Sequence, residues 1–176
     1  ADAGEGGLPN VKGTMQDITA RRRAEEKQKQ SYDLLIKLAA QVPSMIYQFK
    51  LTLDGHMSFP WSNQAIEQIY EVDAATARQD AEWLFQRAHP DDLDKLLRDI
   101  TTSAQRLEPF HCEYRVLLPK QGLQWCLSEA TPEKLQDGSI LWHGITSDIT
   151  ERKEAEEAMR LASLVYQSSS EGMLVT

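Results

Sequence analysis

Residues 144–157 read GITSDITERKEAEE and residues 13–26 read GTMQDITARRRAEE, so one motif occurs twice in this chain of 176 residues. A glycine, Asp-Ile-Thr, an arginine and Ala-Glu-Glu recur in the same order and at the same spacing in both stretches. In each copy, the Asp-Ile-Thr is followed by a charged run that is typical of a helix. Self-similarity at a fixed offset is a signature of repeated modules. The sequence therefore holds two copies of one module boundary.

The two boundaries divide the chain into five expected parts. We expect residues 1–19 to be the tail of a preceding module, residues 20–41 to be a connecting helix, and residues 42–150 to be one complete domain. Residues 151–168 are expected to form a second charged helix, and residues 169–176 to begin a following module.

The connecting helix is expected to begin after Thr19, because threonine is a favourable N-cap residue, and to end before Pro43. After it, alternation of apolar and polar residues predicts two strands, residues 45–53 and 56–61, joined by a turn that contains Gly55.

Three further strands are predicted immediately before the second copy of the motif. They comprise residues 110–118, 123–130 and 140–149, joined by glycine-containing turns. On the first of these, His111 has the opposite parity from the apolar residues and is therefore expected to face outward, while Cys112 is expected in the core.

The segment between the two groups of strands predicts three or four short helices. Ser62 or Asn63 is expected to cap the first, and Asp80 to start another. Residues 89–92 (HPDD) open the clearest helix, because proline suits a first turn and aspartates suit the positive helix end. We therefore predict an α+β fold, with one five-stranded antiparallel sheet, helices on one face and long helices at both ends.

Composition limits the classes of function. The chain has 19 Lys and Arg against 27 Asp and Glu, a formal charge of -8, so nucleic acid is not an expected partner. No apolar run is long enough to span a membrane, and the two cysteines, which lack CxxC spacing, fit a reducing compartment. We therefore expect this segment to be cytoplasmic. A membrane anchor elsewhere in a longer protein stays open. No catalytic or metal-binding signature is present, which indicates that this segment is not an enzyme.

The order of elements and motifs resembles a PAS domain of the sensory-box (PAS/PAC) class, in particular the PAS-fold-3 type. The resemblance rests on these residues: His89 to Asp92, Glu113 to Arg115, Gly122, Trp125, Gly144, Asp148 to Thr150, Arg152 and Glu156 to Glu157. It covers residues 41–150, and the end of the chain resembles the start of a further PAS domain. This implies a bacterial signalling protein with several PAS domains.

The resemblance also implies an output domain elsewhere in the same protein. The sequence that leads into the expected following PAS domain is of a kind common in cyclic-di-GMP proteins, whose GGDEF and EAL domains make or hydrolyse that nucleotide. Such a sequence also occurs in sensor histidine kinases. A third reading is a ligand-free PAS module that acts in dimerisation or as a spacer.

A small-molecule pocket between sheet and helices is a further implication of the resemblance, since some members hold haem, flavin or organic acids there. The candidate lining residues are Trp83, Phe110, Tyr114 and Trp142, although core packing explains these aromatic residues equally well. The chain lacks the Asn-Cys-Arg-Phe motif of the photoreceptor subclass, and helix 92–107 lacks the histidine of haem-binding members. Covalent flavin and haem are therefore disfavoured, and a noncovalent flavin stays open.

The family also implies a role for the motif at the end of the last strand. Asp148, Ile149 and Thr150 are expected to join that strand to the outgoing helix, with Asp148 accepting hydrogen bonds, Ile149 buried and the Thr150 hydroxyl capping the helix. In the helix that follows, apolar residues recur at four and three residues: Ala155, Met159, Ala162 and Tyr166. This spacing favours a parallel homodimer through the flanking helices.

Overall fold

Five antiparallel strands form one sheet in the order β2-β1-β5-β4-β3. The computed structural model describes residues 11–172. The strands are β1 Met45–Leu51, β2 Met57–Ser62, β3 Phe110–Leu118, β4 Gly122–Lys134 and β5 Ile140–Asp148. The first and last strands of the domain, β1 and β5, pair at the centre. The predicted fold class and the predicted bounds of β3 are confirmed.

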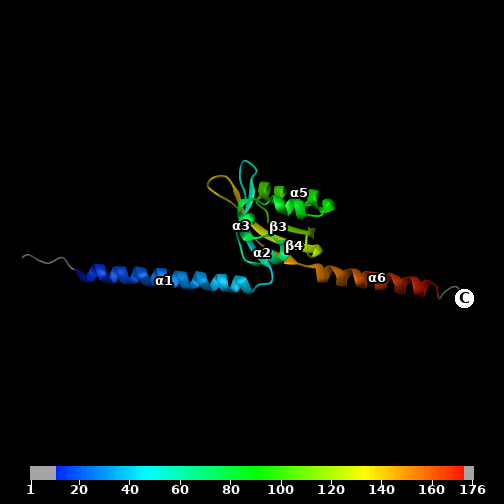
Figure 1. Cartoon of the computed structure of the whole chain (residues 1–176), viewed down its shortest axis with the longest axis horizontal. Coiled ribbons are helices and arrows are strands. Elements are labelled where there is room, and N and C mark those ends of the chain that lie inside the picture. The colour runs from blue at the N-terminus through cyan, green and yellow to red at the C-terminus, as the bar shows by residue number, and fades with distance from the viewer. Residues whose placement is uncertain (1–10, 173–176) are drawn as a thin grey trace, which may run out of the picture. The chain divides into compact units, whose positions relative to one another are not determined.

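Four helices lie between β2 and β3 in the chain: α2 Ala65–Tyr70, α3 Ala74–Gln79, α4 Glu82–Arg87 and α5 Pro90–Arg106. The longest, α5, packs on β3 and is seen above β3 and β4 in Figure 1. His89 is its N-cap and Pro90 its first residue, as residues 89–92 predicted.

The predicted N-cap of the first helix after β2 was assigned to the wrong residue. The N-cap of α2 is Gln64, not Ser62 or Asn63. The Asn63 side chain instead accepts a hydrogen bond from Ile46 N and donates one to Ser44 O, so it ties the end of β2 to the start of β1. Asp80, in contrast, accepts a hydrogen bond from Glu82 N at the start of α4, as predicted.

Strand alternation determines which side chains enter the core. On β3, Cys112 is 1% exposed whereas His111 is exposed, and both agree with the predicted parity. On β5, Gly144 faces the core, where a Cβ atom would lie 2.6 Å from Tyr47 Cζ and 2.7 Å from Ala130 Cβ. This close packing explains a glycine in a strand interior, where the residue is otherwise unfavourable.

The chain divides into two units, residues 1–41 and 42–176, and each is described by itself. The described part of the first unit is α1 Val11–Gln41. The prediction that this helix begins at Thr19 was wrong, because the Thr19 hydroxyl donates to Met15 O within the helix. Residues 1–10 of the expected preceding module lie outside the described residues.

Within the second unit, α6 Thr150–Gly172 follows β5 directly. The expected start of a following module falls partly on α6, and its last residues, 173–176, lie outside the described part of the chain. Among residues 11–172, no helix combines the length and apolar character needed to cross a membrane.

Candidate functional site

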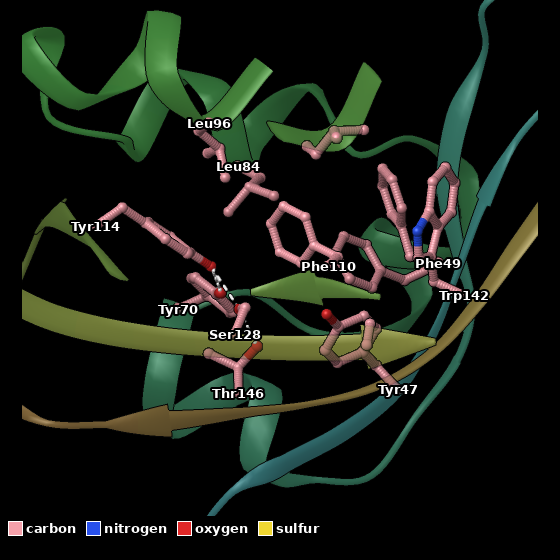
Figure 2. A pocket seen from close by; sticks show the side chains of 13 residues that line it. Tyr47, Phe49, Tyr70, Leu84, Leu96, Phe110, Tyr114, Ser128, Trp142 and Thr146 are labelled. Atoms are coloured by element: carbon pink, nitrogen blue, oxygen red, sulfur yellow. Dashed lines mark hydrogen bonds between the residues drawn. The ribbon is translucent and has the colours of Figure 1, made fainter. Parts of the chain in front are cut away.

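A cavity of about 30 Å³ lies between the inner face of the sheet and the helices (Figure 2). Its sheet side carries aromatic side chains, among them Tyr47, Phe49 and Trp142, and its helix side carries Leu84 and Leu96. A water molecule needs roughly 10–15 Å³ of volume measured in this way. In this structure the cavity therefore has room for about two water molecules.

One end of the cavity is polar. Figure 2 shows four hydroxyl groups gathered there, which come from α2, β3, β4 and β5. Tyr70 hydrogen bonds Tyr114, the Tyr114 hydroxyl lies 3.0 Å from Ser128 Oγ, and Ser128 Oγ lies 2.6 Å from Thr146 Oγ1. We call these residues, Tyr70, Tyr114, Ser128 and Thr146, the hydroxyl cluster.

The hydroxyl cluster and its surroundings carry no charge at neutral pH. Burial raises the pKa of Tyr70 and of Tyr114 well above the ordinary value for tyrosine. Burial also raises the pKa of the nearby Tyr47 to about 12, against the opposing effect of hydrogen bonds to Ser128 and Thr146. The phenols therefore act as neutral hydrogen-bonding groups.

Three of the four predicted pocket residues, Phe110, Tyr114 and Trp142, line this cavity. Trp142 presents only its ring, because its Nε1 donates to Ser103 Oγ at 2.9 Å. Trp83 is not part of the lining. Its ring packs 5.2 Å from the Tyr70 ring, and its buried Nε1 has no hydrogen-bond partner among the described residues.

Of the polar residues that line the cavity, Tyr114 was predicted from the sequence, whereas Tyr47, Tyr70, Ser128 and Thr146 were not. Ser128 and Thr146 are 3% and 1% exposed, although serine and threonine are usually at the surface. The available signal was parity, since Ser128 alternates with the buried Cys126 and Ala130 on β4. A small polar residue at an inward strand position indicates a buried polar partner.

Beyond the C-terminal end of β5, the Asp-Ile-Thr segment joins the sheet to α6. Asp148 Oδ1 accepts a hydrogen bond from Thr150 N at 2.8 Å, and Ile149 is buried. The Thr150 hydroxyl does not cap the helix as predicted. It accepts from Trp125 N at 2.9 Å and donates to Gln124 Oε1 at 2.8 Å, so it fastens the first turn of α6 to β4.

Charged side chains of α6 also contact the sheet. Arg152 and Lys153 bind the carboxylate of Glu113 on β3, at 2.7 Å and 2.5 Å. The Lys153 ammonium lies 5.1 Å from the centre of the Trp125 ring, and the Arg115 guanidinium lies 5.5 Å from it. These distances are within the range of cation–π attraction.

Arg115 extends this cluster to the start of α5. Its guanidinium binds both carboxylate oxygens of Asp92, at 2.8 Å and 2.7 Å, and its backbone N–H donates to the same carboxylate. The sequence motifs 89–92, 113–115 and 148–150, with Trp125, thus meet at one place. We call this group, Asp92, Glu113, Arg115, Trp125, Thr150, Arg152 and Lys153, the junction cluster.

The cavity and the junction cluster share two strands. In the β4–β5 ladder, Ser128 pairs with Thr146 and Cys126 pairs with Asp148. The hydroxyl cluster is therefore only two ladder positions from Asp148, the last residue of β5, which accepts a hydrogen bond from the first residue of α6.

Residues 60–146 match the family model described as the PAS fold. Together with the five-stranded sheet and the helices on its inner face, this match shows that the central part of the chain has the PAS fold. The predicted resemblance to the PAS class is confirmed at the level of the fold.

Two solved structures share the fold. A sensory box histidine kinase/response regulator from Burkholderia thailandensis aligns with a TM-score of 0.55 at 18% identity, over 78% of this chain and 98% of that one. The N-terminal domain of a diguanylate cyclase with a PAS/PAC sensor from Marinobacter aquaeolei aligns with a TM-score of 0.51 at 16% identity, over 62% and 98%.

Among curated proteins, the chain is 32% identical over 114 residues to the uncharacterized protein y4lL of Sinorhizobium fredii. That match covers 60% of this chain and 14% of the relative. The chain thus spans a small part of the length of the curated relatives it matches, 14% and 9% of the first two.

Proposed function

We propose that this domain senses a ligand or partner state and relays it through α6 to a cyclic-di-GMP synthase or phosphodiesterase output in the same protein. The observation that carries the proposal is the continuity between cavity and exit helix along β4 and β5. The Asp148–Thr150 segment and the junction cluster then form the relay. In this scheme a stimulus acts by favouring one of two arrangements of α6 on the sheet.

The proposed domain arrangement is the one that the repeated motif indicates. A preceding PAS domain would end near residue 19, the sensory domain would comprise residues 42–150, and α6 would lead toward a following PAS domain. The diguanylate cyclase neighbour supports a cyclic-di-GMP output by analogy of fold. The histidine kinase neighbour supports a kinase output on the same ground.

A ligand-free dimerisation or spacer module is the second candidate function. The small size of the cavity, about 30 Å³, favours it, because a flavin would need the pocket to widen considerably. The two candidates differ in one respect that can be measured. Both need α6 to be attached to the sheet, but only the sensor needs that attachment to change with the stimulus.

The relay is tested in the full-length protein by measuring nucleotide synthesis and hydrolysis, or autophosphorylation, with and without stimulus. We expect Asp148→Ala and Thr150→Val to keep the fold, as measured by circular dichroism. Both variants should lose most of the difference in output activity between the stimulated and the unstimulated protein. The matched controls are Asp94→Ala and Thr101→Val, at exposed positions of α5. Unchanged regulation in both junction variants would refute the relay.

A further inference from the structure

The chemistry of the cavity lining restricts the ligands that it can accept. No Asp, Glu, Lys, Arg or His side chain is among the described residues that line it. A charged ligand would therefore lose its hydration without gaining an opposite charge, which costs several kcal/mol for a buried ion. The lining thus selects against carboxylates, phosphates and ammonium groups.

The hydroxyl cluster adds a directional preference. Each hydroxyl carries one hydrogen and two acceptor lone pairs. The contacts from Tyr70 through Tyr114 and Ser128 to Thr146, together with the hydrogen bonds of Tyr47 to Ser128 and Thr146, use most of the available hydrogens as donors. The capacity that remains is therefore mainly acceptor capacity, and a ligand that donates one O–H hydrogen bond fits it best.

The remainder of the cavity is apolar. Leu84 and Leu96 face it from the helices, and Phe49 and Phe110 face it from the sheet (Figure 2). Ile100 on α5 also lines it. A ligand needs an apolar body on this side, since an unpaired polar group would be buried without a partner. The volume restricts that body to a few carbon atoms unless the leucine side chains move.

We infer that the cavity is a binding site for a small uncharged molecule with one hydroxyl group on an apolar body, of the size of a short-chain alcohol. The hydroxyl donates to the cluster at Ser128 and Thr146, and the carbon atoms lie against Leu84 and Leu96. The inference rests on the proposed sensory function, because it names the ligand class for the cavity that the relay would read.

Three probes with equal numbers of non-hydrogen atoms test the ligand class: 1-propanol, methoxyethane and acetate. Binding is followed through the ¹H–¹³C methyl resonances of Leu84, Leu96 and Ile100. We expect saturable shifts with 1-propanol in about the millimolar range, as befits so small a ligand. Methoxyethane, which has no O–H, should bind about tenfold more weakly, and acetate should not bind measurably.

The site of hydroxyl recognition is tested with Thr146→Val, which keeps the shape of the side chain. The affinity of this variant for 1-propanol should fall about fivefold to tenfold, which corresponds to the loss of one hydrogen bond. Ser147→Ala is the matched control, because its hydroxyl bonds Ser44 and not the cluster, and its affinity should not change. Xenon, which needs no hydrogen bond, should shift the same methyl resonances in both variants and so report an intact cavity.

Equal binding of methoxyethane and 1-propanol would overturn hydroxyl recognition, and binding of acetate would overturn the exclusion of charge. No binding of 1-propanol to a domain that still takes up xenon would overturn the ligand class altogether. None of these results affects the relay, whose test is the regulation of output in the Asp148 and Thr150 variants. Failure of the ligand class and failure of the proposed function are therefore distinguishable.

Discussion

The guanidinium of Arg115 lies between two partners that come from different parts of the chain. It binds the Asp92 carboxylate through both oxygens and lies over the Trp125 ring. Hydrogen bonding to Arg115 holds the pKa of Asp92 below its usual value, against the opposing effect of burial. Asp92 is thus a structural anchor for α5 as well as a first-turn acid.

We predict that Asp92→Asn lowers the free energy of unfolding by about 1–3 kcal/mol at pH 7, the range for a hydrogen bond to a charged group. Because the folded-state pKa is lowered, this contribution is complete above the unfolded-state pKa of about 3.9 and is lost as the pH falls through the folded-state pKa. The difference between variant and wild type at pH 7 should therefore shrink when the pH is lowered below about 3.9. Urea unfolding at both pH values measures it.

Asp91→Asn is the control for this prediction. Asp91 also lies in the first turn of α5, so it shares the interaction with the helix dipole, but its carboxylate is exposed and lies 3.5 Å from Arg115. Its replacement should change the stability by less than about 1 kcal/mol. Equal effects of the two replacements would show that the helix dipole, and not Arg115, is responsible.

At the scale of elements, the contacts described above between α6 and the sheet all involve the first turn of α6. Thr150 bonds β4, and Arg152 and Lys153 bind Glu113 on β3. From about Met159 onward, the described apolar side chains of α6 are exposed. In the proposed relay, the junction cluster is therefore where the sheet would change the position of the helix.

We predict that Glu113→Gln loosens the start of α6 without unfolding the sheet. Loss of the ion pairs to Arg152 and Lys153 should accelerate amide exchange in the first two helical turns by about threefold to tenfold, while exchange in β4 and β5 stays unchanged. Hydrogen–deuterium exchange measures this at low salt, and the difference should diminish at high salt, which screens the wild-type pairs.

The control for Glu113→Gln is Glu129→Gln on β4. Glu129 forms an exposed pair with His111 at 3.1 Å and does not contact α6. Its replacement should leave the exchange of α6 unchanged. If Glu113→Gln also leaves the amide exchange of α6 unchanged, the ion pairs do not hold the helix. The relay must then act through Thr150 alone.

At the scale of the whole molecule, both terminal helices carry exposed apolar side chains. Met159 and Tyr166 on α6 are 74% and 78% exposed, and Leu35 on α1 is 64% exposed. Large exposed apolar residues in a row on a helix are typical of an interface. We propose that they lie in the seam of a parallel homodimer formed by the flanking helices.

We predict that the double replacement of Met159 and Tyr166 by Lys converts the dimer into a monomer, because charges in the seam repel each other and bury poorly. Sedimentation velocity should show at least a tenfold weaker self-association. Glu154→Lys, outside the seam, changes the net charge by the same amount and should leave self-association unchanged. A dimer that persists in the double variant would place the interface elsewhere.

Much of this architecture was predictable because local patterns determine it. Alternation marked β3 with its correct bounds, Pro90 and the two aspartates marked the start of α5, and turn glycines separated the strands. The repeated motif indicated where the last strand is followed by a helix, since α6 begins at Thr150. Phe110, Tyr114 and Trp142 were named as pocket residues on the basis of residue type and family resemblance.

The tertiary structure decided what the individual residues contact. Parity shows that Ser128 and Thr146 face inward, but only the pairing of β4 with β5 makes them neighbours, and only the position of α2 brings Tyr70 to Tyr114. The local preference of Thr150 predicts a helix cap, whereas its hydroxyl accepts from Trp125 N and donates to the Gln124 side chain on the adjacent β4.

The sequence by itself thus determined the elements, their order and the class of the domain, because hydrophobic periodicity and turn chemistry act over a few residues. The cavity with its hydroxyl cluster and the junction cluster were decided only by the tertiary structure. Both bring together side chains from strands and helices far apart in the chain, and the relative placement of such elements depends on packing across the whole core, which no local pattern encodes.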